Sequence, residues 1–324
     1  MQTDLSLQRP PRQMVRGLRN TLRVPGPLKV GELRCVLVAV DFSLYAERTL
    51  VAVGQLPLAA DAEVHLIHSL ETKEREPSAL AELETLALRE LQRRAVALER
   101  AVERAGRAPI RAKVTVLRGP PTERLPEEAR RLGAELLVVG RHGRRRFGDS
   151  LIGATAERLV RHSHCPVLVV QRRKAAAWQR LLVAVDLEEA SPSPLPRLRR
   201  FCPEAPHVDV VHVYDTSNDL ILQEAGASAG QYQEYDEALR KGAEAALARV
   251  LAETPLAPSV ALRPLVHSGD PRSVILAEAR ACRSDLLVLG THARRGLAHF
   301  FMGSVAESVL RHAPCDVLIL PPPQ

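Results

Sequence analysis

The sequence predicts an α/β protein made of two tandem, doubly wound domains, each with a five-stranded parallel sheet. The first supporting observation is an internal repeat: "VLVAVDFS" (36–43) recurs as "LLVAVDLE" (181–188), and "GRHGRRRFGDSLIGATAE" (140–157) recurs as "GTHARRGLAHFFMGSVAE" (290–307). A period of about 150 residues is too long for a solenoid and indicates a duplicated domain. The second observation is that apolar runs alternate with helical patterns in each copy, which is typical of a parallel sheet covered on both faces.

In the first copy, short apolar runs rich in β-branched residues predict buried strands, and longer amphipathic segments predict helices between them. Ser43 is placed to cap the first helix, and Gly106 is placed to end the second. The residues of the second helix expected to face the core are Leu80, Leu83, Leu86, Leu91, Val96 and Leu98. The expected strands are 35–40, 63–70, 111–117, 135–140 and 166–170, and the expected helices are 44–55, 78–105, one after Pro121, and 154–163.

The second copy repeats this order with one change. After Asp186 the sequence "LEEASPSPLPRLRRF" contains Pro192, Pro194 and Pro196. Proline cannot continue a regular helix, so the first helix of this copy is expected to be short or displaced. The strands of this copy are expected near 181–185, 208–214, 260–266, 285–289 and 316–320. The predicted domains are a disordered basic arm (1–33), domain 1 (34–171), a linker (172–179) and domain 2 (180–321).

Composition narrows the class of protein. Apolar residues make up 46% of the 324 residues, but no apolar run approaches the length of a membrane span. The five cysteines are an odd number without a CxxC pair, which favours a reducing cytoplasm over a disulfide framework. The net charge is +7, yet aromatic residues are not interleaved with the arginines, and this disfavours a nucleic-acid surface.

Two features of the first copy suggest where a ligand would bind. Asp41 follows the first strand, and the loop Gly140-x2-Gly143-x9-Gly153 follows the fourth. In an open parallel sheet, ligands bind at the carboxyl ends of the strands. A carboxylate can accept hydrogen bonds from ribose hydroxyls, and a loop that runs into a helix N-terminus can hold phosphates through its amides.

These residues resemble the universal stress protein family in a tandem form. The resemblance rests on "VLVAVDFS", on the glycine loop and on "AERLVRHSHCPVLVV" in the first copy, with matching segments in the second, and it covers 34–171 and 179–321. It implies strand order 3-2-1-4-5 and ATP binding in members that keep the loop. It also implies pairing through the last strand, so that 166–170 and 316–320 would join the two copies as an intramolecular pseudo-dimer.

The resemblance further implies which residues meet the nucleotide. In domain 1 they are Asp41, Ser69, Gly140, Gly143, Gly153, Ala154 and Thr155. In domain 2, a second candidate site, they are Asp186, Val213, Gly290, Gly303, Ser304 and Val305. The aspartates would lie against ribose or adenine, Ser69 and Val213 beside adenine, and the glycines along the phosphates. The expected ligand is ATP, with or without Mg²⁺, and an unidentified protein partner and a homodimer both stay open.

The two loops depart from the family pattern in different ways. Copy one has Ala154 where the family has Ser or Thr, and copy two has Ala293 at the second glycine. Ser304 to Glu307 reads as a capping box, so Ala154 is expected to cost about 1 kcal/mol of capping. If Ala293 needs a positive φ, its strain is about 1–2 kcal/mol. The sequence therefore favours domain 1 as the nucleotide site.

The leading interpretation is a cytoplasmic, non-catalytic nucleotide-binding regulator of the stress response. One alternative is a slow ATPase or phosphoryl-transferring enzyme, for which Asp149 is the only acidic residue inside the first loop. Another is a scaffold that binds no nucleotide. His162, His164 and Cys165 could form a metal site, but the repeat of His162 and Cys165 in copy two favours a structural role.

Overall fold

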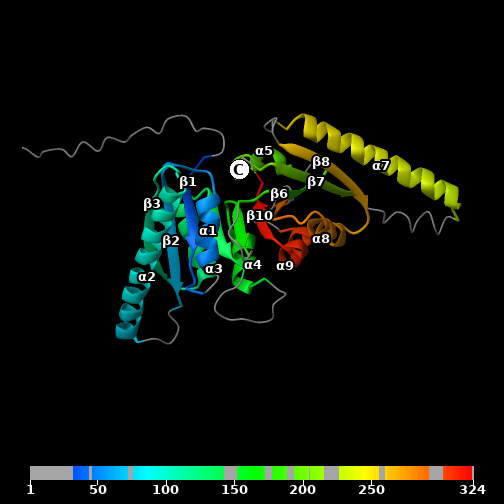
Figure 1. Cartoon of the computed structure of the whole chain (residues 1–324). Helices are drawn as coiled ribbons and strands as arrows, with labels where there is room; N and C mark the ends of the chain where they lie inside the picture. Colours follow the sequence, from blue (N-terminus) through cyan, green and yellow to red (C-terminus); the bar gives the residue numbers. More distant parts are fainter. Residues whose placement is uncertain are drawn as a thin grey trace, which may run out of the picture.

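The two copies form one continuous sheet with helices on both faces (Figure 1). The structure, a computed structural model, describes residues 32–43, 46–71, 76–141, 152–171, 177–187, 193–203, 205–214, 226–254, 260–291 and 302–322. Within these residues the sheet has ten strands in the order β3-β2-β1-β4-β5-β10-β9-β6-β7-β8. Each half thus has the expected order 3-2-1-4-5, which confirms the predicted fold. Residues 1–31 of the expected arm lie outside the described residues.

Domain 1 contains the predicted elements in the predicted order. They are β1 (Leu33–Ala39), α1 (Ala46–Gln55), β2 (Leu58–Leu70), α2 (Pro77–Arg104), β3 (Arg111–Arg118), α3 (Pro121–Leu132), β4 (Leu136–Gly140), α4 (Ala154–His162) and β5 (Val167–Val170). Neighbouring strands are parallel, and β1 pairs with both β2 and β4. Leu37 and Val38 of β1 are fully buried because helices cover both faces of the sheet.

The core-facing side of α2 differs from the prediction. Leu80, Leu91 and Leu98 are buried as expected, but Leu86 and Val96 are 53% and 45% exposed. The remaining buried positions of the helix are Ala87, Ala95 and Val102. Small alanine side chains let a helix approach the sheet closely, and apolar size alone did not reveal them as core residues. Gly106, with φ of 68°, ends the helix as predicted by donating to the Glu103 carbonyl.

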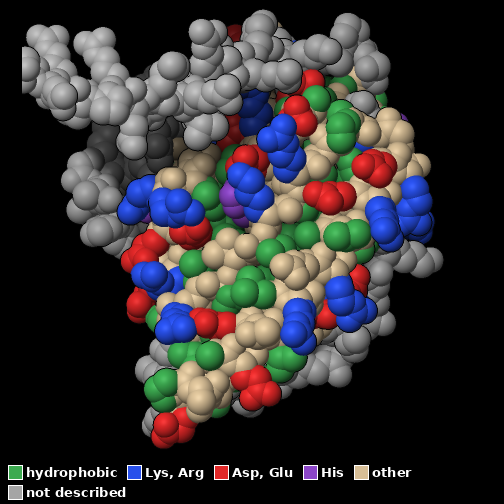
Figure 2. Space-filling view, turned by 90° about the vertical axis from the view of Figure 1, so that its left-hand side faces the viewer, with side chains coloured by type: hydrophobic (Ala, Val, Ile, Leu, Met, Phe, Trp, Pro, Cys, Tyr) green, Lys and Arg blue, Asp and Glu red, His purple; other side chains and the backbone are tan. Residues whose placement is uncertain are grey.

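The side of the molecule that carries α2 shows acidic and basic side chains interspersed with apolar ones (Figure 2). Arg118 donates to both carboxylate oxygens of Glu84, and Arg93 donates to Glu90 at 2.9 Å. Cations on this face are therefore partly matched by carboxylates. Such mixed charge is typical of a solvated surface rather than of a nucleic-acid footprint.

Domain 2 repeats the architecture with a reduced first helix. Its elements are β6 (Arg180–Ala184), α5 (Leu195–Leu198), β7 (His207–Tyr214), α7 (Ala229–Ala252), β8 (Ala261–Ser268), α8 (Pro271–Ala281), β9 (Leu286–Gly290), α9 (Ser304–His312) and β10 (Asp316–Leu320). The helix α5 has 4 residues, against 10 in α1, as the prolines predicted. Along α7 the buried residue is Leu247, whereas α2 buries six side chains.

The domains are joined through the strands that the resemblance implied. β5 and β10 are antiparallel, with Leu168 opposite Leu318. Next to this seam, α4 and α9 are joined by ion pairs between equivalent Glu and Arg residues of the two copies. Arg311 donates two hydrogen bonds to Glu157, at 2.7 and 3.1 Å, and Arg161 lies 3.3 Å from Glu307. The intramolecular pairing is therefore confirmed.

The Glu157–Arg311 pair should make domain pairing sensitive to acid. Hydrogen bonds from Arg311 lower the pKa of Glu157 below its ordinary value of 4.5. A lowered pKa means that the stabilisation is complete above pH 4.5 and is lost as the pH falls through the lower, folded-state pKa. We expect Glu157→Gln to cost about 1 kcal/mol at pH 7 and less near pH 3, measured by urea unfolding at both pH values.

A matched control is Glu127→Gln, which removes an exposed pair with Arg124 inside domain 1. It should change the free energy of unfolding by less than about 0.5 kcal/mol at both pH values. A cost of Glu157→Gln that persists undiminished at pH 3 would contradict the proposed origin of the acid sensitivity.

Asp316 fastens the linker to the seam between the domains. This aspartate is 1% exposed and opens β10, at the position where copy one has Pro166. Its Oδ1 accepts a hydrogen bond from the Gln171 amide at 2.8 Å, and its Oδ2 accepts one from the Trp178 indole at 3.0 Å. A buried carboxylate is costly unless such donors satisfy it, so Asp316 holds Gln171 and Trp178 at the domain seam.

Candidate functional site

The carboxyl edge of the domain 1 sheet brings the candidate residues of that domain together. Val38 of β1 lies opposite Leu66 of β2 and Val138 of β4. Asp41, just after β1, therefore lies at the same edge as Ser69 and Gly140, which are in the last residues of β2 and β4. Gly153 joins them because its amide donates to the Arg141 carbonyl at 2.8 Å. The predicted clustering thus holds for every candidate in domain 1 that the structure describes.

Asp41 has one oxygen engaged and one available. Its Oδ1 accepts hydrogen bonds from the Ser43 amide at 3.0 Å and from the Ser43 hydroxyl at 2.7 Å. This local turn fixes the carboxylate at the end of β1. No hydrogen bond from a described residue reaches Oδ2. That oxygen could accept a hydrogen bond from a sugar hydroxyl.

An aromatic pair beside Asp41 was missed in the sequence analysis. The rings of Phe42 and His68 lie 4.4 Å apart between centroids and are tilted by 44°. His68 Nδ1 donates to the Val40 carbonyl at 2.6 Å, and Arg94 covers the Phe42 ring at 5.3 Å. The aligned residue in copy two is Leu187, so this flat, polarisable surface belongs to domain 1. The only sequence signal was an aromatic residue directly after Asp41, in a chain with 3% aromatic residues.

Ser69 and the two equivalent histidines, His162 and His312, form hydrogen bonds with backbone carbonyls. The Ser69 hydroxyl donates to the Gly119 carbonyl at 2.7 Å, which links the end of β2 to the end of β3. His162 Nδ1 donates to the Arg158 carbonyl, and His312 Nδ1 donates to the Ser308 carbonyl, each at 2.8 Å. The repeat of this bond in both copies supports a structural role for these histidines. No group of three or more potential metal ligands occurs in the described part of the chain.

The two helices that follow the glycine loops begin one residue earlier than the capping-box prediction required. Gly153 and Gly303 are the N-cap residues, and neither helix has a side-chain cap. The capping box from Ser304 is therefore wrong: Ser304 is the first helical residue, and its hydroxyl accepts from Arg272 at 3.3 Å. Ala154 occupies the same first helical position in α4, so having alanine there removes no capping hydrogen bond.

Glycine at the N-cap leaves amides at the helix end uncovered. In α4 the amides of Ala154, Thr155 and Ala156 form no hydrogen bond to the described residues, and Glu157 is the first whose amide donates within the helix, to Gly153. In α9 the same holds for Ser304, Val305 and Ala306. Three free amides at the positive end of a helix dipole are suited to an anionic group.

Domain 2 places its candidate residues at the equivalent edge. Asp186 follows β6, and Gly290 is the last residue of β9. Val213 is half-buried and lies near the carboxyl end of β7. His212 Nδ1 donates to the Val185 carbonyl at 3.1 Å, as His68 does to Val40. The loop residues Gly143, Asp149 and Ala293, on which part of the sequence argument depended, lie outside the described residues.

The sequence profile of the universal stress protein family matches residues 32–171 and again residues 177–321. The chain belongs to this family. It is a tandem universal stress protein, and both matched segments contain a strand-end aspartate and a glycine at the cap of the helix after the loop.

Individual proteins of the family are similar to this chain in part of the sequence or in fold. A putative universal stress protein of Staphylococcus aureus (strain USA300) is 43% identical over 53 residues, which are 16% of this chain and 32% of that protein. The match therefore spans less than two thirds of the relative. A universal stress protein from Archaeoglobus fulgidus has a TM-score of 0.59 and 17% identity, covering 89% of this chain and 98% of that one. A putative universal stress protein from Pseudomonas aeruginosa UCBPP-PA14 has a TM-score of 0.56 and 17% identity, covering 89% of this chain and 93% of that one.

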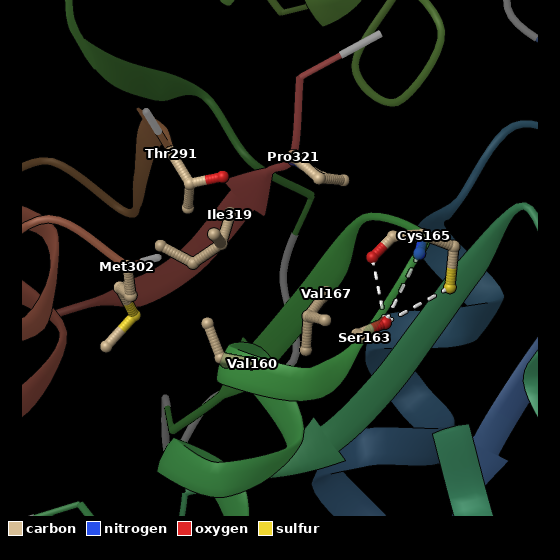
Figure 3. A pocket seen from close by; sticks show the side chains of 8 residues that line it. All are labelled: Val160, Ser163, Cys165, Val167, Thr291, Met302, Ile319 and Pro321. Carbon is tan, nitrogen blue, oxygen red and sulfur yellow. Dashed lines mark hydrogen bonds between the residues drawn. The ribbon is translucent and has the colours of Figure 1, made fainter. Parts of the chain in front are cut away.

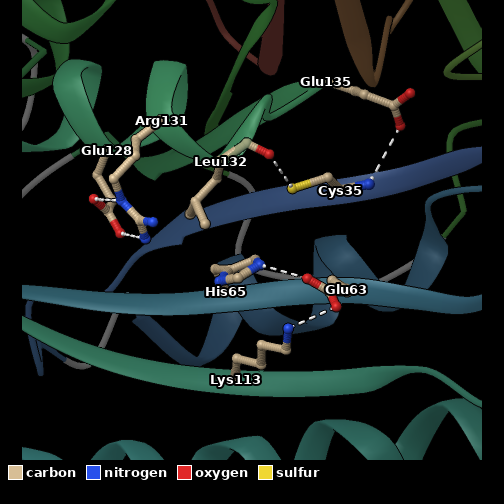
Figure 4. A network of polar contacts seen from close by, with 8 residues as sticks. All are labelled: Cys35, Glu63, His65, Lys113, Glu128, Arg131, Leu132 and Glu135. Atoms are coloured by element: carbon tan, nitrogen blue, oxygen red, sulfur yellow. Dashed lines mark hydrogen bonds and ion pairs between the residues drawn. The ribbon is translucent and has the colours of Figure 1, made fainter. Parts of the chain in front are cut away.

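A second polar cluster of this universal stress protein lies at the amino edge of the domain 1 sheet (Figure 4). Glu63 accepts from Lys113 at 2.6 Å and lies 3.2 Å from His65, and the Lys113 hydrogen bond lowers the pKa of Glu63. Burial raises the pKa of Cys35 to about 11, and its thiol donates to the Leu132 carbonyl. A protonated thiol is a poor nucleophile, so this cluster is interpreted as structural.

None of the helices in the described ranges combines the length and the apolar character needed to cross a bilayer. All five cysteines are free thiols, and burial raises the pKa of the half-buried Cys202 thiol strongly.

Proposed function

We propose that this tandem universal stress protein binds ATP in domain 1 and acts as a non-catalytic regulator of the stress response. The observation that carries the proposal is the set of uncovered amides at the start of α4, at the same sheet edge as Asp41. Asp41 Oδ2 would accept from the ribose, and the amides of Ala154, Thr155 and Ala156 would hold phosphate oxygens. Phe42 and His68 would lie beside the base. A Mg²⁺ ion arriving with ATP would be held mainly by phosphate oxygens.

Two differences between the domains support domain 1 as the site. The loop of domain 1 is closed at its base by the Gly153 amide, which donates to the Arg141 carbonyl. Among the described residues, Gly303 and Thr291 form no such bond in domain 2. Domain 2 also has Leu187 in place of the aromatic Phe42. A site whose ends are already held loses less conformational entropy when a ligand binds.

The test is calorimetric titration of the purified full chain with ATP, ADP and AMP. One adenine nucleotide per chain, with ATP preferred, is the expected result. Two nucleotides per chain would show that domain 2 is also a site, and none would support the scaffold alternative. Phosphate release from Mg·ATP at a steady rate by the same preparation would favour the slow ATPase. A cytoplasmic location and a protein partner that recognises the ATP-bound surface are further parts of the proposal.

A further inference from the structure

Arg141 occupies the base of the domain 1 loop. Its amide donates to the Val170 carbonyl at 2.9 Å, which joins the end of β4 to the end of β5. Its carbonyl accepts from the Gly153 amide at 2.8 Å. The backbone of this one residue therefore joins both ends of the loop between β4 and α4.

The side chain of Arg141 leaves its own domain. Its guanidinium donates to the carbonyl of Arg311, in the last turn of α9 in domain 2, at 2.8 Å. It also donates to the carbonyl of Ala313, the C-cap of the same helix, at 2.9 Å. Carbonyls at a helix C-terminus lack partners within the helix and carry the negative end of its dipole, so they suit a cation. Burial lowers the pKa of this guanidinium. The hydrogen bonds to the two carbonyls give the partly buried cation polar partners.

The equivalent position in domain 2 lacks this connection. Thr291 replaces the arginine, and its hydroxyl is buried without a hydrogen-bond partner in the described structure. Next to it is a small cavity, in which Thr291 and Pro321 of domain 2 face Ser163 of domain 1 across the boundary (Figure 3). By the repeat, Ser163 and Pro321 correspond to Ala313 and Gln171, which flank the Arg141 guanidinium on the other side. The cavity thus lies where the repeat would place a second arginine side chain.

We propose that Arg141 is a positioning residue, through which domain 2 holds the ends of the domain 1 loop in the form that binds nucleotide. This inference rests on the proposed function. Because the carbonyls at the C-terminal end of α9 (Ser304–His312) hold Arg141, a shift of α9 would move the base of the domain 1 loop. Among the described residues, Thr291 makes no equivalent contact with the end of α4. The Arg141 contact is therefore the one that links a loop to the partner domain in the described structure, and by linkage nucleotide binding in domain 1 and the position of α9 affect each other.

The test compares Arg141→Thr, which installs the residue of domain 2, with Gln171→Ala in the full chain. Gln171 is a matched control because its side-chain amide donates to the same Ala313 carbonyl at 3.0 Å but is not part of the loop. Arg141→Thr is expected to weaken ATP binding about ten-fold and to speed hydrogen exchange of the Gly153 amide, whereas Gln171→Ala does neither. Arg141→Lys, which can still reach one carbonyl, should partly restore both.

Each outcome decides the proposal. Unchanged exchange at Gly153 in Arg141→Thr overturns it, as does faster exchange without loss of affinity in a protein that binds ATP. Equal losses in Gln171→Ala also overturn it, because they would reflect the domain seam in general. If the wild-type chain binds no ATP, the proposed function fails, and Gly153 exchange without nucleotide alone decides whether Arg141 holds the loop.

Discussion

Replacing Gly153 by aspartate is expected to weaken ATP binding at least about 100-fold without destabilising the protein. Gly153 is the N-cap of α4, with φ of −63° and ψ of 139°, an extended conformation that any residue adopts. An aspartate there would accept hydrogen bonds from the amides of Thr155 and Ala156 and place a negative charge where phosphate is proposed to bind. The phosphate would then lose its hydrogen bonds from these two amides, which should weaken ATP binding about 100-fold or more, measured by calorimetry. Helix capping should leave the free energy of unfolding unchanged or raise it by a few tenths of a kcal/mol.

The matched control is Gly303→Asp, which makes the same change at the N-cap of α9. It should leave ATP affinity unchanged if domain 1 is the site. The reverse result, with binding lost in Gly303→Asp and kept in Gly153→Asp, would move the site to domain 2. Loss of binding in both variants with intact folding would require both domains to contribute.

Asp316→Ala is expected to cause a large loss of stability. The substitution leaves the Gln171 amide and the Trp178 indole as buried donors without an acceptor, at about 1–3 kcal/mol each. We expect a total loss of about 2–5 kcal/mol in urea unfolding. Trp178 is the single tryptophan of the chain and is 6% exposed, so its fluorescence emission should move to longer wavelength as water enters the seam.

Trp178→Phe serves as the control for this prediction, since it keeps an aromatic ring but removes the indole donor. Circular dichroism follows its unfolding, because the fluorophore is lost. The double variant should lose less stability than the sum of the two single variants, since both remove one shared hydrogen bond. Strict additivity would show that Asp316 does not act through Trp178.

Much of the fold was predictable because its signals are local. Strands such as β4 are short apolar runs, and the prolines at 192, 194 and 196 act on the backbone directly, so both could be read from the sequence. The placement of Asp41 and Gly140 at one edge followed from a general property of parallel sheets.

Other features were predicted wrongly or missed. Leu86 was expected in the core and is 53% exposed, because a helix meets its sheet along a narrow strip that apolar size does not define. The capping box at Ser304 failed because Gly303 is the N-cap and Ser304 is already the first helical residue. A shift of one residue changes the role of every side chain in the first turn. Phe42 gained its significance only when β2 brought His68 beside it.

The sequence by itself determined that the chain is two copies of one α/β domain, with a strand-end aspartate and a glycine loop in each, because these features depend on residues close together in the chain. Only the tertiary structure decided how the copies differ. Arg141 lies 170 residues from Arg311, whose carbonyl it holds, and Asp316 lies 138 residues from Trp178. Such contacts depend on how β5 and β10 align at the seam, which no local pattern encodes. In the repeat alignment, Arg141 and Thr291 are simply different residues at equivalent positions. In the folded chain, the Arg141 side chain crosses the seam, whereas Thr291 borders a cavity.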